Sequence, residues 1–214
     1  MSKVKEGLPE EAVAAYQKAV AIAPDYAEAH KGLGLVYLDS NRPQEAVDSF
    51  MQAVKYNPND SAAVKKLAIL YSHQDKYELA LGAINQAFEI RPNDPENYLY
   101  LGDIYFWAFK LDEAEEAFKR AIYLNPVYAQ AYENLGFVYI MSGIIGKPGM
   151  HEKAIQVFRD AIGLEPDNAE AHYGLGSALK SLEMHEEAYR EYLILKGLDD
   201  EWAKRLIEDI NKST

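Results

Sequence analysis

The feature that most constrains the fold of this chain is a repeat of 34 residues marked by prolines. Pro24, Pro58, Pro92 and Pro126 are 34 residues apart, and Pro166 follows after 40. A fixed period of this length is typical of a solenoid, in which copies of one small unit stack on their neighbours and bury a shared core.

Two further patterns recur between the prolines. A leucine followed by a small residue stands at Leu33-Gly34, Leu67-Ala68, Leu101-Gly102, Leu135-Gly136 and Leu175-Gly176. Later in each copy come an alanine and, four residues on, a large apolar residue: Ala46 and Phe50, Ala80 and Ile84, Ala114 and Phe118, Ala154 and Phe158, Ala188 and Tyr192. Apolar residues three and four apart lie on one helical face, so each copy predicts two amphipathic helices of about 12–14 residues. No strand-like alternation is present.

This pattern resembles the tetratricopeptide repeat family over residues 9 to about 198. The resemblance implies a single all-α domain over 1–214, a right-handed α-solenoid of antiparallel helix pairs with a C-terminal capping helix. The implied parts are a half repeat at 1–26, full repeats at 27–60, 61–94, 95–128, 129–168 and 169–198, and the cap at 199–214. The family hosts many partners on one scaffold, so it indicates function only broadly.

Both ends of the repeat pattern are irregular. Gly7-Leu8-Pro9 reads as a turn before a lone second helix at 10–22. We favour a chain cut from a longer protein over a natural start here; either would leave an apolar face open to another copy or another molecule. At the other end, 199–201 begins a last helix with an apolar side, expected to seal the array: Trp202, Ala203, Leu206, Ile207 and Ile210.

The fourth repeat carries six extra residues near 142–150, predicted to form a loop at one edge. Ile144 and Ile145 are unusual in a solvated loop. They are expected either to cover a neighbouring helix end or to contact a partner.

Sequence features argue against several function classes. There is no cysteine, and the pairs His151-Glu152 and His185-Glu186 lack the second histidine of a zinc-protease motif. We therefore expect no enzyme activity, no metal site and no cofactor. The net charge of −12 opposes binding to nucleic acid, and no apolar run is long enough for membrane insertion. The cytoplasm is the default expectation, although a trimmed export signal would leave the same sequence.

The resemblance implies that the first helix of each pair lines a concave groove. The groove residues predicted to bind a peptide or protein are Lys31, Leu35, Lys65, Lys66, Ile69, His73, Leu99, Tyr100, Asp103, Trp107, Asn134, Phe137, Met141 and Tyr173. Seven residues are predicted to form one apolar patch at mid-groove: Leu99, Tyr100, Phe106, Trp107, Phe137, Ile140 and Met141. The alternative is that some of them, Phe106 and Ile140 above all, pack against the next repeat. The three lysines predict a basic spot, so a partner with an acidic end and apolar anchors would fit.

Three functions stay open on the sequence alone. The leading one is an adaptor that binds a protein segment, extended or helical, in the groove. The second is a scaffold that forms homo-oligomers through the incomplete N-terminal repeat. The third is a module of a larger regulatory protein.

Overall fold

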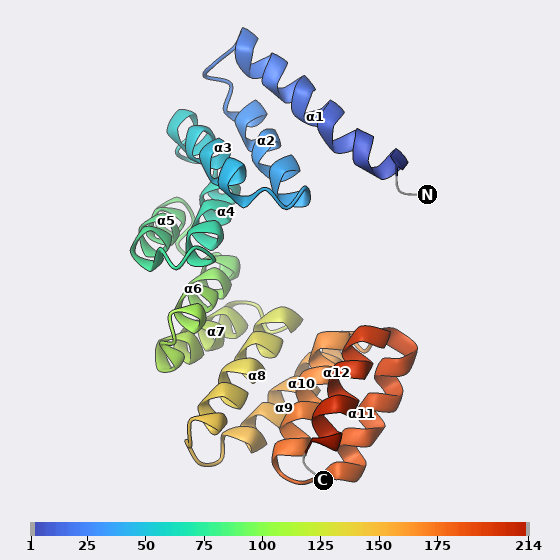
Figure 1. Cartoon of the computed structure of the whole chain (residues 1–214). Coiled ribbons are helices and arrows are strands. Elements are labelled where there is room, and N and C mark those ends of the chain that lie inside the picture. Colours follow the sequence, from blue (N-terminus) through green and yellow to red (C-terminus); the bar gives the residue numbers. More distant parts are fainter. Residues whose placement is uncertain (1–2, 213–214) are drawn as a thin grey trace. The chain divides into compact units, whose positions relative to one another are not determined.

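The computed structural model describes residues 3–212, and side chains are described from Pro9 onward. The described chain contains twelve helices and no strand (Figure 1). The helix bounds are α1 Lys3–Ile22, α2 Ala27–Asp39, α3 Pro43–Tyr56, α4 Ser61–Ser72, α5 Tyr77–Ile90, α6 Pro95–Trp107, α7 Leu111–Leu124, α8 Ala129–Ile144, α9 Met150–Leu164, α10 Ala169–Ser181, α11 His185–Leu198 and α12 Asp200–Asn211. The predicted all-α class is confirmed.

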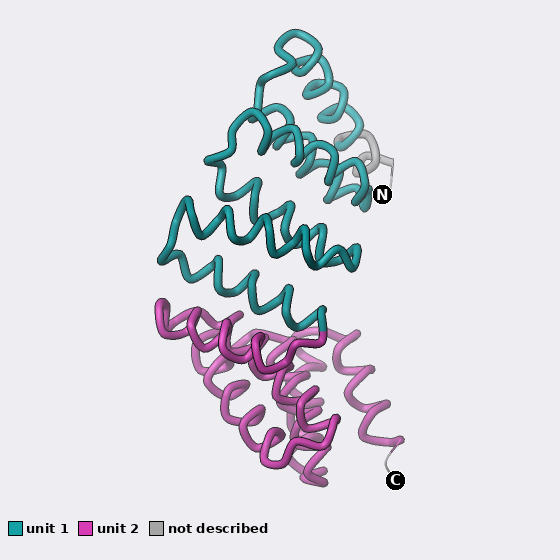
Figure 2. The backbone as a smooth tube through the Cα atoms, turned by 90° about the vertical axis from the view of Figure 1, so that its left-hand side faces the viewer, with its two compact units in different colours: residues 1–108 teal, residues 109–214 magenta. Residues whose placement is uncertain are grey.

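The chain forms two compact units (Figure 2). Unit 1 spans Met1–Ala108 and holds α1 to α6; unit 2 spans Phe109–Thr214 and holds α7 to α12. Within unit 1, α2 packs on α3 and α4 on α5; within unit 2, α8 packs on α9 and α10 on α11. The third predicted pair is the exception, because its first helix belongs to unit 1 and its second to unit 2.

The small residues lie where two helices approach closely. A Cβ added to Gly34 would stand 2.8 Å from the Phe50 ring, and one added to Gly136 would stand 2.6 Å from the Phe158 ring. Both phenylalanines are fully buried. In these two pairs, a small residue opposite a large aromatic one therefore sets the spacing of the helices, since packed cores leave no space for another methyl group.

The Pro-Asn-Asp segments end one helix and cap the next. Asp60 accepts hydrogen bonds from the backbone amides of Ala62 and Ala63, and Asn168 accepts one from Ala171. These side chains satisfy amides that would otherwise lack a partner at a helix N-terminus.

Two predicted boundaries differ from the structure. The turn expected at Gly7-Leu8-Pro9 is helical, because α1 already begins at Lys3 and carries Pro9 inside it. The insertion in the fourth repeat is only partly a loop: α8 continues to Ile144, and the connection is the short segment 145–149. An ion pair between Lys147 and Asp112 of α7 holds this connection, and Gly149 supplies its positive φ of 72°.

The last helix closes unit 2. It packs on α10 and α11 and buries Ala203, Leu206 and Ile210. The capping helix predicted from the apolar side of 199–214 is confirmed.

Candidate functional site

The candidate site in unit 2 is a pocket on the first helices of its repeats. Its volume is about 270 Å³, and its walls come from α8, α10 and α12. The lining residues are Phe137, Ile140, Ile144, Tyr173, Ser177, Lys180, Ser181 and Asp209. Seven of these residues come from α8 and α10, the first helices of two repeats, and the eighth, Asp209, comes from α12.

One wall of the pocket is apolar and the opposite wall is polar. Phe137 packs edge-on against the buried Phe158 ring at 5.2 Å, so its position is fixed by the core. Ile144 is 66% exposed and presents its side chain at the edge of the pocket. A partner's apolar side chain would here replace water against Phe137, Ile140 and Ile144, which is favourable in proportion to the area covered.

Tyr173 connects the two walls. Its ring packs against Trp202 of α12 at a tilt of 40°, with 4.6 Å between centroids, and its hydroxyl donates a hydrogen bond of 3.3 Å to Asp209. Arg205 lies over both rings, 5.5 Å from the Tyr173 centroid and 4.7 Å from that of Trp202. Burial raises the pKa of the Tyr173 hydroxyl. These contacts hold the polar wall in place before any partner arrives.

A buried carboxyl, that of Glu133, lies one helical turn before Phe137 on α8. Glu133 of α8 accepts a hydrogen bond of 2.8 Å from the Asn168 amide, and it is also hydrogen-bonded to Glu170. Burial, with the bond and charge of Glu170, raises the pKa of Glu133 to about 8, although the Asn168 bond acts in the opposite direction. Glu133 therefore holds its proton at neutral pH in the folded chain.

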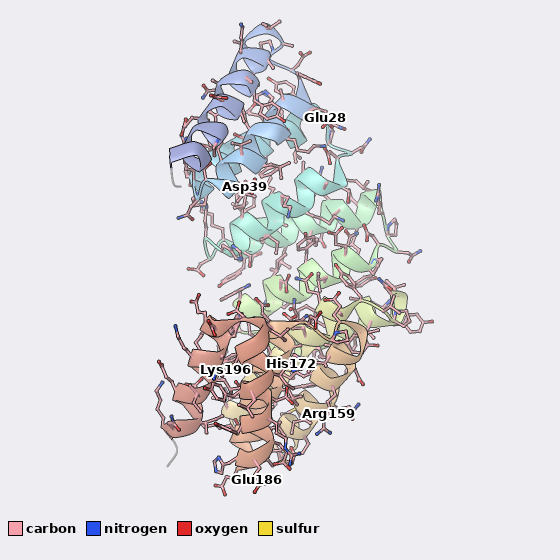
Figure 3. All side chains as sticks on the ribbon, turned by 90° about the vertical axis from the view of Figure 1, so that its right-hand side faces the viewer. Glu28, Asp39, Arg159, His172, Glu186 and Lys196 are labelled. Atoms are coloured by element: carbon pink, nitrogen blue, oxygen red, sulfur yellow. The ribbon has the colours of Figure 1, made fainter. Side chains whose placement is uncertain are left out.

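His172 is a buried structural residue of α10 (Figure 3). Its Nδ1 lies 2.6 Å from Glu191 of α11, and its Nε2 lies 3.0 Å from the carbonyl oxygen of Pro166. The bond to Glu191 raises the pKa of His172, outweighing the effect of burial. Both ring nitrogens can then donate, which links two helices across the pair.

The basic spot expected in unit 1 is largely neutralised. Lys31 pairs with Glu28 at 2.8 Å and with Asp60 at 2.7 Å. Lys65 is buried and pairs with Asp94 at 3.1 Å and with Glu96. Each of these two lysines therefore binds the aspartate that caps the first helix of the following repeat. Of the three predicted lysines, only Lys66 is exposed.

The residues of the predicted mid-groove patch are divided between the two units. Leu99, Tyr100, Phe106 and Trp107 belong to unit 1, whereas Phe137, Ile140 and Met141 belong to unit 2. Leu99 is 2% exposed and Tyr100 packs on the core cluster around Ile104, so neither presents a free anchor. Sequence periodicity identifies the helix face but not how deeply the neighbouring helix covers it.

The other predicted residues vary in exposure. Leu35, Lys66, His73 and Trp107 are exposed; Ile69, Asp103, Asn134, Phe137, Met141 and Tyr173 are half-buried. Of the fourteen, the structure brings Phe137 and Tyr173 into the unit 2 pocket. The sequence prediction missed Ser181 and Asp209 as pocket residues. Asp209 lies on a helix that was expected only to seal the array. Ser181 lies at the end of α10, outside the residues predicted to face the groove.

Features that would indicate a metal site or a membrane-spanning helix are absent from the part of the chain that the structure describes. The side chains described, those of residues 9–212, include no cluster of three or more His, Cys, Asp or Glu suited to hold a metal ion. Across the same range, no helix has both the length and the apolar character that crossing a membrane requires.

Comparisons with known proteins agree with this architecture. Family models described as tetratricopeptide or TPR repeats match residues 3–70, 95–126 and 148–182. No curated protein sequence matches the chain. Among solved structures, MamA is 25% identical, with a TM-score of 0.60 over 83% of this chain and 94% of its own.

Two further solved structures share the fold. A thermophilic TPR protein of Thermus thermophilus is 23% identical, with a TM-score of 0.72 over 86% of this chain and 98% of its own. The pilF protein of Pseudomonas aeruginosa is 19% identical, with a TM-score of 0.68 over 86% of both chains.

Proposed function

The chain belongs to the tetratricopeptide repeat family, and on that premise we propose that it is a protein-interaction scaffold without catalytic activity. Its partner is a peptide or protein segment held against the first helices of unit 2. The observation that carries the proposal is the pocket between α8, α10 and α12, where an apolar wall faces a polar one.

The dimensions of the pocket indicate what it holds. A volume of about 270 Å³ suits one large apolar side chain of a partner, because sites for small molecules are usually larger. Burying such a side chain contributes about 1.5–3 kcal/mol. Micromolar affinity corresponds to about 8 kcal/mol, so the segment must make further contacts, for which Lys180 and Asp209 offer one charge of each sign.

Two neighbouring isoleucines provide the test. Ile144 lines the pocket, whereas Ile145 does not, and both are exposed, at 66% and 53%. Ile144→Asp should lose partners in an affinity pull-down from a native lysate, while the matched control Ile145→Asp should retain them. Both variants must first show the helicity and melting temperature of the unmodified chain. Equal recovery with both variants would rule out the pocket as the binding site.

Self-assembly is a second candidate, favoured by the surface of α11. Four apolar side chains of this helix are 38–52% exposed: Tyr189, Leu193, Ile194 and Leu198. An apolar surface of this kind can pair with its own copy across a two-fold axis. Light scattering should then give a mass above 24.1 kDa that falls to the monomer value in Leu193→Glu, Ile194→Glu. A monomer at every concentration of the unmodified chain would remove this candidate.

A further inference from the structure

A second hollow lies in unit 1, at the ends of two first helices. Its volume is about 400 Å³, and it is lined by Ser72, His73, Asp75 and Trp107. Helix α4 ends at Ser72 and helix α6 ends at Trp107 (Figure 1). The C-terminal end of a helix carries a partial negative charge, so two such ends at one hollow favour a cation there.

The side chains of the hollow add to this preference. Trp107 is 55% exposed, with the His73 ring edge-on to it at 5.9 Å. An exposed indole attracts cations to its face. Asp75 supplies a carboxylate, and the Tyr77 hydroxyl fixes the surrounding turn because it lies 2.8 Å from both Asp75 and the carbonyl oxygen of Trp107.

The hollow also contains a buried polar atom without a partner. Ser72 is 1% exposed, and its Oγ makes no hydrogen bond. Buried hydroxyls are nearly always hydrogen-bonded, since an unpaired one loses its interaction with water and gains nothing in exchange. A rotation of the Ser72 side chain toward the hollow would let a bound group donate a hydrogen bond to this oxygen.

We propose that this hollow binds a cationic side chain, the ammonium of a lysine or the guanidinium of an arginine, presented by a partner protein. The cation lies on the Trp107 indole and pairs with Asp75. The net charge of −12 attracts such a partner. The site belongs to unit 1 and does not depend on the pocket of unit 2.

Tryptophan emission gives a direct test. The chain has two tryptophans, Trp107 and Trp202, so Trp202→Phe leaves Trp107 as the single reporter. In that background, the amides of N-acetyl-arginine and N-acetyl-lysine should change the emission saturably, with a Kd of about millimolar order. The uncharged N-acetyl-norleucine amide should produce no saturable change.

Asp75→Asn is the decisive variant, with Asp39→Asn as its control. Asn41 holds the same turn position after α2 with a positive φ of 54°, so asparagine fits the backbone at 75, where φ is 57°. Removing this carboxylate should raise the Kd about tenfold. Asp39, at the end of α2, does not line the hollow and its variant should bind normally (Figure 3). An equal response to norleucine amide, an unchanged Kd in Asp75→Asn, or no saturable change with either cation would overturn the proposal.

Discussion

At the scale of single residues, one column of the repeat links three of the first helices to the residue that caps the first helix of the following repeat. Lys31 bonds to the capping Asp60, Lys65 to the capping Asp94, and Glu133 to the capping Asn168. The chemistry within each pair is matched: a carboxylate cap takes a cation, and an amide cap donates to a carboxyl. These links explain why Lys31 and Lys65 are not free for a partner.

Lys65→Met tests the link in unit 1. Removing the lysine leaves the carboxylates of Asp94 and Glu96 together without their cation, so the free energy of unfolding should fall by about 3 kcal/mol. Adding Asp94→Asn should restore more than half of the loss, because asparagine still caps α6. Urea denaturation measures both, with the exposed Lys66→Met as control. A loss from Lys66→Met as large as that from Lys65→Met would contradict the assignment.

Glu133→Gln tests the carboxyl in unit 2. The folded pKa of about 8 lies above the usual value of 4.5, so the stability that Glu133 contributes is complete below pH 4.5 and is lost as pH rises toward 8. Glutamine keeps the acceptor for Asn168 and does not ionise. The variant should match the unmodified chain near pH 5 and exceed its free energy of unfolding at pH 8.5 by about 4 kcal/mol. Thermal unfolding at the two pH values decides this; a constant difference between them would refute it.

At the scale of elements, the turns between paired helices share one backbone conformation but not one residue type. Asn41, Asp75, Phe109 and Glu183 have φ values of 54°, 57°, 60° and 59°. The left-handed region suits asparagine and aspartate and is unfavourable for bulky residues. Phe109 is also 61% exposed, so its ring gains little from packing in exchange.

Phe109→Asn should therefore stabilise the chain by about 1 kcal/mol. The reciprocal Asn41→Phe should destabilise it by a similar amount, because it places a bulky residue at the same φ. Chemical denaturation of both variants measures the two changes. Loss of stability in Phe109→Asn would instead mean that the aromatic ring makes stabilising contacts in the native state.

The sequence predicted the helices better than it predicted which of their side chains are exposed. The 34-residue period identified the helix pairs, and the Gly136–Phe158 contact follows from the alternation of small and large residues. The repeat period could not reveal that the side chains of Lys65 and Leu99 are buried. Lys65 is held by Asp94, which lies 29 residues further along the chain, and the period does not show how deeply Leu99 lies in the core. The unit 2 pocket was predicted only in part. Phe137 and Tyr173 lie on the helix faces expected from the sequence, whereas the place of Asp209 in the pocket depends on where α12 packs.

At the scale of the whole molecule, the described carboxyl and imidazole groups with a raised pKa are unevenly distributed. Glu133 and His172, whose folded pKa values are raised, both belong to unit 2. In unit 1, burial favours a higher pKa for Asp60, but the bonds from Lys31 and two backbone amides lower it overall. Asp60 thus contributes stability that is lost only as pH falls below its usual value of 3.8.

Raising the pH from 6 to 8.5 should therefore weaken unit 2 more than unit 1. Across this range Glu133 approaches and passes its folded pKa, and the contribution of His172, whose pKa is raised by its bond to Glu191, also decreases as pH rises. Each unit contains one tryptophan, Trp107 in unit 1 and Trp202 in unit 2. The urea midpoint read from Trp202 in Trp107→Phe should fall over this range, whereas the midpoint read from Trp107 in Trp202→Phe should change little. Circular dichroism at pH 6 controls for effects of the substitutions, and equal shifts in both reporters would show that the two units unfold as one cooperative body.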